Sequence, residues 1–147
     1  MKVDAEIERN LTDYQGWNAG ESEFGFLDYT CCVATPDLFF GFSELLVPEL
    51  VEHEGEWFRA EKFDRKTHED WKRALADPLA IQKVMNHIHL STLFQDQVVA
   101  DAVALAAARQ LATIWSRVLA DKGLVAEAYG DNLTDLEVTF FRRAAGG

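Results

Sequence analysis

The chain has 147 residues, of which 48% are hydrophobic and 12% aromatic. This length and composition predict a single domain with one core, and they exclude the polar, aromatic-poor composition of disordered chains. There are 25 acidic and 14 basic residues, which give a net charge of −11. That charge disfavours nucleic acid and anionic membrane surfaces as partners.

The first residues and the cysteines bear on where the protein resides. The start is charged and lacks an apolar run, so we expect neither a secretory signal nor a transit peptide. No stretch approaches the roughly 20 apolar residues that a membrane-spanning helix needs. The two cysteines, Cys31 and Cys32, are adjacent, and neighbouring residues form only a strained disulfide. We therefore expect a cytoplasmic protein.

The first third of the chain predicts an arm, a strand and a helix. Residues 1–23 are polar and favour an N-terminal arm with a short helix and a loop. Residues 24–34 are rich in β-branched and aromatic side chains, which favours a strand. Thr35 followed by Pro36 is an N-cap signal, and apolar residues at helical spacing then predict a helix of about 10 residues. Pro48 should end it.

The middle of the chain predicts a turn, a strand and two short helices. Residues 52–56 favour a turn, and residues 57–63 alternate well enough for a half-buried strand. Asp64 or Thr67 can cap a helix that runs to Leu75. Asp77 followed by Pro78 repeats the capping signal for a helix that reaches about His87.

The last third predicts one long helix and two strands. Residues 97–122 carry a dense apolar stripe in an alanine-rich background, and Gly123 is a typical terminating residue. Strands are expected at 124–130 and 136–142, with a turn between them, and residues 144–147 as a frayed tail. Together these elements predict an α+β fold, in which a small, mainly antiparallel sheet of about four strands packs against several helices, one of them long.

Five glutamates form the densest acidic cluster: Glu44, Glu49, Glu52, Glu54 and Glu56. Such clusters often do no more than solvate a surface. They can also act as a recognition surface, because charged rims set association rates and partner choice. Beside His53 they can also serve general acid and base chemistry if burial shifts their pKa values. We predict the recognition surface, with a basic protein as partner.

His87 and His89 are the strongest local candidates for metal ligands. In an extended segment, alternate side chains share a face, so both imidazoles can reach one ion. On a helix they would point apart. The alternative is that both histidines lie at a helix end and hydrogen-bond to the backbone. Nothing in the spacing identifies a third ligand.

The remaining patterns have simpler interpretations. Cys31 and Cys32 read as small core residues of a strand, because no basic residue lies nearby in the sequence to activate a thiolate. A set of aromatic residues can line an apolar pocket or simply form core. The chain contains no glycine-rich phosphate loop and no zinc-type cysteine pairing. The aromatic set is Phe39, Phe40, Phe42, Trp57, Phe58, Phe63 and Trp71.

Three functional hypotheses follow. The first is an acidic, non-enzymatic protein-binding domain, such as an immunity or antitoxin-like neutraliser of a basic partner. The second is a metal-dependent enzyme that uses His53, His87 and His89 with glutamates of residues 49–56. The third is a homo-oligomer whose aromatic surface is an interface or a small-molecule pocket.

Overall fold

The computed structural model describes residues 2–19 and 24–143. These residues form eight α-helices, one 3₁₀ turn and five strands. The helices are α1 (Ala5–Glu8), α2 (Thr12–Trp17), α3 (Phe26–Val33), α4 (Pro36–Leu46), α5 (Arg65–Leu75), α6 (Pro78–Asn86), α7 (Leu90–Leu93) and α8 (Asp101–Val118), and the 3₁₀ turn is η1 (Ala120–Lys122). The strands are β1 (Leu50–His53), β2 (Glu56–Arg59), β3 (Ile88–His89), β4 (Leu124–Tyr129) and β5 (Glu137–Arg142).

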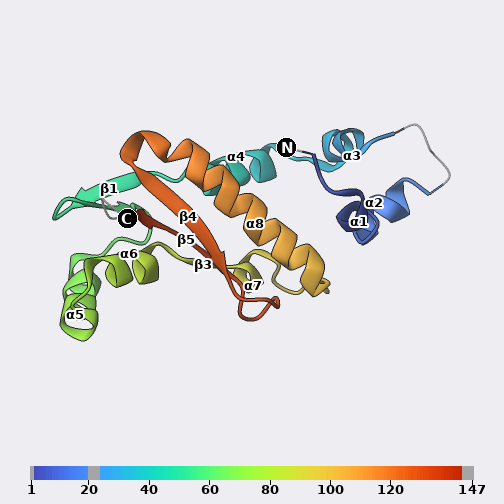
Figure 1. The fold of residues 1–147 in the computed structure, drawn as a ribbon. Helices are drawn as coiled ribbons and strands as arrows, with labels where there is room; N and C mark the ends of the chain where they lie inside the picture. Colours follow the sequence, from blue (N-terminus) through green and yellow to red (C-terminus); the bar gives the residue numbers. More distant parts are fainter. Residues whose placement is uncertain (1, 20–23, 144–147) are drawn as a thin grey trace.

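A three-stranded antiparallel sheet in the order β3-β5-β4 forms the centre of the fold. Figure 1 shows α8 lying along this sheet, with α6 and α5 beyond it. The β4–β5 connection turns at Gly130, whose φ is +94°. A Cβ at this position would lie only 2.6 Å from the carbonyl oxygen of Asp135. Only glycine fits this turn, because the backbone closes directly over it.

Strand β5 is buried on both faces, which explains its run of bulky residues. Val138 and Phe140 pack into the main core with α8. Thr139 faces the other way, and its hydroxyl donates to the carbonyl of Lys83 in α6. The Lys83 ammonium also lies 4.4 Å from the ring centre of Phe141. Since successive side chains alternate between faces, the strand between two helices needs apolar residues on both.

Strands β1 and β2 form a separate antiparallel hairpin, in which Val51 pairs with Phe58. Its turn residues, Glu54 and Gly55, have φ values of +52° and +82°. Two consecutive left-handed residues match the twist of a tight hairpin.

The buried Asn86 joins the hairpin to the central sheet. Its amide donates to the carbonyl oxygens of Trp57 and Phe140, at 3.0 and 3.1 Å. Its side-chain oxygen accepts a hydrogen bond from the backbone N–H of Arg59.

The main core lies between α8 and the central sheet. Trp115 and Phe140 are both fully buried, with ring centres 5.4 Å apart in an edge-to-face arrangement. Ala104 and Ala108 are also fully buried, which lets α8 approach the strands closely. We call α5–α8, η1 and the two sheets the body of the protein.

The helices α1–α3 extend from the body near the start of α8, and α4 connects them to it (Figure 1). Tyr14 is buried and packs edge-to-face against Phe26, with ring centres 5.3 Å apart. Its hydroxyl donates to the carbonyl of Phe24. An aromatic contact therefore holds α2 and α3 together.

The prediction of a strand at 24–34 is wrong, because this segment forms the helix α3. The carboxylate of Asp28 accepts a hydrogen bond from the N–H of Gly25 and caps the helix. Phe26, Tyr29 and Val33 also follow helical spacing. β-propensity depends on having a strand to pair with, and here the segment packs on α2 instead. The expected sheet of about four strands is accordingly two smaller antiparallel sheets, and the α+β class is confirmed.

The other predicted elements are largely confirmed. Helices α4, α5 and α6 follow the predicted capping residues Thr35, Asp64 and Asp77, each of which accepts a backbone hydrogen bond. The long helix starts four residues later than predicted and ends before a 3₁₀ turn.

The predicted turn at 52–56 contains only two turn residues. The strand β1, which precedes the turn, was not predicted. Strand β2 ends at Arg59, because the chain turns there and Lys62 N–H donates back to the Arg59 carbonyl. The predicted tail at 144–147 lies outside the described residues. In the described part of the chain, no helix has both the length and the apolar character needed to cross a membrane.

Candidate functional sites

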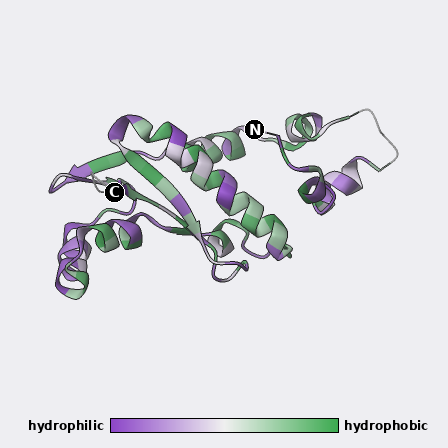
Figure 2. Cartoon of the chain, in the orientation of Figure 1, coloured by the Kyte–Doolittle hydropathy of each residue, from purple (hydrophilic) through white to green (hydrophobic). Residues whose placement is uncertain are grey.

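A continuous stretch from Thr30 to Phe42, spanning the end of α3 and the first two turns of α4, is exposed at every residue. We call it the exposed segment. Phe39 and Phe40 are 64% and 66% exposed, and Phe42 is 55% exposed. Figure 2 shows hydrophobic residues on α4 as it does on α8 and β4. Apolar side chains of this size are normally buried, so this segment needs an explanation.

The C-terminal end of α4 is attached to the body. Leu45 and Leu46 pack against the main core. The indole N–H of Trp115 donates to the carbonyl of Leu45 at 2.9 Å, which satisfies one of the free carbonyls at the helix end. These contacts attach the C-terminal end of α4 to the body, whereas its first two turns, which carry the three phenylalanines, remain exposed.

The exposed segment lies in a part of the sequence without basic residues. Between Arg9 and Arg59 there is no lysine or arginine, whereas ten acidic residues lie there. These ten charges nearly equal the net charge of the whole chain, so the excess of acid is local. This signal was available from the sequence and was missed. The ten are Asp13, Glu21, Glu23, Asp28, Asp37, Glu44, Glu49, Glu52, Glu54 and Glu56.

The five glutamates predicted to bind a partner divide into two groups. Glu54 and Glu56 lie close to cations of the same chain, with Lys72 at 2.9 Å and Arg142 at 3.7 Å respectively. Glu44, Glu49 and Glu52 are exposed, and none of them forms an ion pair within the described residues. Glu44 and Glu49 line one hollow together with Val47, just beyond the exposed segment. These three remain available to a partner.

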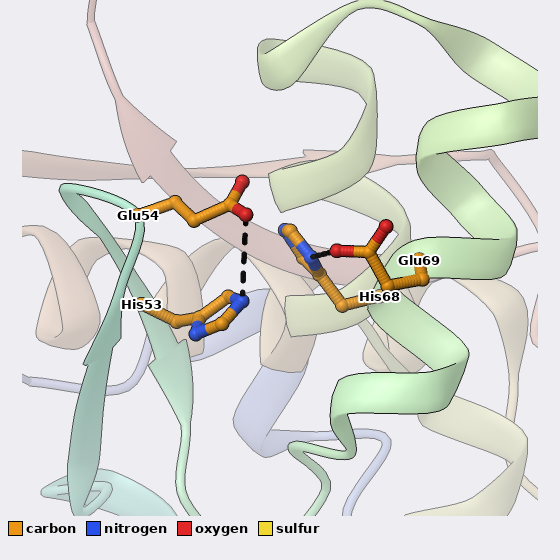
Figure 3. Close-up of side chains that lie close together, drawn as sticks. All are labelled: His53, Glu54, His68 and Glu69. Atoms are coloured by element: carbon orange, nitrogen blue, oxygen red, sulfur yellow. Dashed lines mark ion pairs between the residues drawn. The ribbon is translucent and has the colours of Figure 1, made fainter.

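His53 belongs to a cluster that the sequence did not predict, because two of its members, His68 and Glu69, come from α5. Figure 3 shows His53 and Glu54 on the hairpin facing His68 and Glu69 on the helix. One ligand-type atom from each of the four residues lies within 4.8 Å of the others. The rings of His53 and His68 are 4.7 Å apart.

A lysine already supplies a positive charge to the His53 cluster. The Lys72 ammonium lies 2.9 Å from Glu54 and 3.5 Å from Glu69. Its hydrogen bond lowers the pKa of the Glu54 carboxyl, and the same bond raises the pKa of Lys72. His68 is only 4% exposed, and its Nδ1 has no hydrogen-bond partner among the described residues. Burial lowers its pKa, and the neighbouring His53 lowers it further.

His87 and His89 converge as the metal-ligand hypothesis requires. His87 follows the last turn of α6 in an extended conformation, and His89 lies in β3. Their Nε2 atoms are 3.1 Å apart. Glu137 is paired with His89 across the β3–β5 ladder, and its carboxylate lies within 4.8 Å of both imidazoles. Nothing in the sequence pointed to Glu137, because strand pairing brings it to the two histidines.

The hypothesis of one site made from all three histidines is not supported, because His53 lies in a different cluster from His87 and His89.

The predicted aromatic pocket does not form as one site. Phe58 is buried with Phe63 and Trp71 in a small core, while Trp57 packs against the main core. Phe39, Phe40 and Phe42 remain exposed to solvent. A cavity of about 350 Å³ is found elsewhere, between α2, α3 and the start of α8, and none of the predicted aromatics lines it.

The prediction that Cys31 and Cys32 are core residues is also wrong. Both are free thiols exposed on α3, because the segment is a helix with no sheet to cover it.

Comparisons with known proteins add no assignment. A scan against protein-family models finds no match to this chain. Searches of the curated proteins and of the solved structures find no match either. The functional interpretation therefore rests on the geometry above.

Proposed function

We propose that this chain is a non-enzymatic protein-binding domain that docks a basic partner on the exposed segment. The observation that carries the proposal is the uncovered aromatic half of α4. At 55–66% exposure, its three phenylalanines alone leave on the order of 300–400 Å² of aromatic surface in solvent. That is the scale of the largest apolar patch on a typical monomer, and such patches commonly mark binding sites.

Charge favours a basic partner over a second copy of the chain. A two-fold interface brings the same patch of both subunits together. Here that would bring two acidic regions together, each without a lysine or arginine between residues 9 and 59. A partner with a hydrophobic groove and a basic margin would bury the phenylalanines and pair with Glu44, Glu49 and Glu52.

These requirements are those of an immunity or antitoxin-like neutraliser, which covers a basic protein, and we propose the function in this form. We place it in the cytoplasm, where the exposed thiols of Cys31 and Cys32 stay reduced.

The two cysteines provide the experiment, because both lie within the exposed segment and the chain has no others. A photocrosslinker attached to these thiols should capture one basic protein from the native lysate. The purified pair should then form a one-to-one complex. A matched control carries the crosslinker on α5, which lies away from α3 and α4 (Figure 1), at the exposed position Lys66→Cys in a Cys31→Ser/Cys32→Ser background, and should not capture the same protein.

Two variants test the contributions of the surface and of the charge. Phe39→Ser/Phe40→Ser should weaken the purified complex at least about 100-fold, since buried aromatic anchors dominate binding energy. Glu44→Lys/Glu49→Lys should lower the association rate and flatten its salt dependence. Crosslinking of the chain to itself, capture of an acidic protein, or a complex that tolerates the double phenylalanine change would each refute the proposal.

A further inference from the structure

The described residues contain two clusters with enough nitrogen and carboxylate ligands to hold a metal ion. They differ in whether a lysine or arginine of the chain already pairs with their carboxylates. In the His53 cluster, the Lys72 ammonium lies between two carboxylates. In the second cluster, within the described residues, no lysine or arginine pairs with Glu137. We call His87, His89 and Glu137 the histidine pair site.

The hydrogen bond at the far side of the His87 ring determines which nitrogen is free. The Nδ1 of His87 bonds to the carbonyl oxygen of Val84, one turn earlier in α6. A carbonyl can only accept, so the proton of the neutral ring lies on Nδ1 and Nε2 carries the lone pair. Metal-binding histidines are commonly oriented in this way by a carbonyl behind the ring.

The distance between the two imidazoles fits a shared ion. Two nitrogens bound to one tetrahedral Zn²⁺, each at about 2.0–2.1 Å, lie roughly 3.3–3.4 Å apart. The two Nε2 atoms are 3.1 Å apart before any adjustment. Glu137, fixed opposite His89 by strand pairing, supplies a carboxylate on the same side. Two imidazoles and one carboxylate form a ligand set that zinc accepts readily.

We propose that the histidine pair site binds one Zn²⁺ ion. The three protein ligands leave a fourth position open, and it faces solvent because His89 is exposed. Sites of this kind take water or a group from another molecule at the open position. The site is separate from the exposed segment and does not depend on the proposed function.

Calorimetric titration of the full chain with zinc chloride tests the proposal, with Co²⁺ absorption as a second readout of ligand geometry. We expect saturable binding of one ion per chain. His89→Ala removes an exposed side chain, so the variant should fold normally, and it should bind zinc at least about 100-fold more weakly. Glu137→Gln keeps the shape of the side chain and should weaken binding about 10-fold or more.

Variants of the other cluster and of the exposed segment provide matched controls. His53→Asn and Phe39→Ser/Phe40→Ser should bind zinc as the wild type does. Lys72→Met removes the ammonium from the His53 cluster and should also leave zinc affinity unchanged. An absence of saturable binding, or wild-type affinity in His89→Ala, would overturn the proposal. Tighter binding in Lys72→Met or weaker binding in His53→Asn would assign the ion to the other cluster.

Discussion

The body and the exposed segment both contain large aromatic side chains, but these are buried in the body and exposed to solvent in the segment. Trp115 and Phe140 are fully buried, whereas Phe39 and Phe40 are about two-thirds exposed. Apolar area stabilises a fold only when it leaves water on folding. The body should therefore carry the stability of the isolated chain, and the exposed segment should carry its capacity to bind. The following experiments test this division, from the largest expected effect to the smallest.

Phe140→Ala should lower the free energy of unfolding by about 3–5 kcal/mol, because it opens a cavity in a core that cannot collapse fully. Urea denaturation of the purified chain measures this loss. The ring contacts Trp115 edge-to-face, so tryptophan emission should change as well. A cost below about 1 kcal/mol would show that the main core is not the principal source of stability.

Asn86→Ala should cost about 2–4 kcal/mol, since it leaves two carbonyls and one N–H without their partner in a dry environment. The same denaturation series detects it. Asn10→Ala is the matched control, because Asn10 is exposed and its amide donates to the nearby Glu6 carbonyl. If Asn86→Ala is no worse than this control, Asn86 does not couple the hairpin to the central sheet.

The buried His68 should make stability depend on pH. Its pKa in the folded chain lies below the ordinary value of 6.5, mainly because burial disfavours the charged form. Below pH 6.5 the unfolded chain therefore binds more protons than the folded chain. The His68 contribution is complete above pH 6.5 and is lost as the pH falls through the folded pKa.

Melting temperatures measured from pH 8 to pH 5 test this dependence. They should fall less steeply for His68→Phe than for the wild type. Parallel curves for the two proteins would show that His68 does not cause the loss.

Phe39→Ser/Phe40→Ser should change the free energy of unfolding by less than about 0.5 kcal/mol, as expected for exposed positions. Thermal and urea unfolding of the isolated chain both measure it. A loss above about 1 kcal/mol would mean that the two rings pack on the body in solution, and the contrast between the two regions would fail.

Local signals predicted the helices α4, α5, α6 and α8 and the strands β4 and β5, whereas β1, β3 and α7 were missed. A capping residue followed by proline identified the starts of α4 and α6, since both act within one turn of the chain. The sequence also indicated that His87 and His89 share a face if their segment is extended, and the structure shows an extended segment there. Glu137 and His68 were beyond such reasoning, because strand pairing and helix packing bring them to their sites from distant parts of the chain.

The exposed segment shows a second limit of prediction from sequence. Phe39 and Phe42 follow helical spacing as core residues do, so spacing alone cannot distinguish a buried face from a binding face. The absence of lysine and arginine between residues 9 and 59 is the pattern that separates this region from the body.

The tight turn at Gly130 limits how this chain can change in length. It begins the connection from β4 to its partner β5, and β5 in turn places Glu137 opposite His89. Inserting one residue between Glu137 and Val138 would move Glu137 to the opposite face of the sheet. Glu137 would then point away from the histidines, so loop grafts at this end of the molecule should preserve the turn and the strand register together.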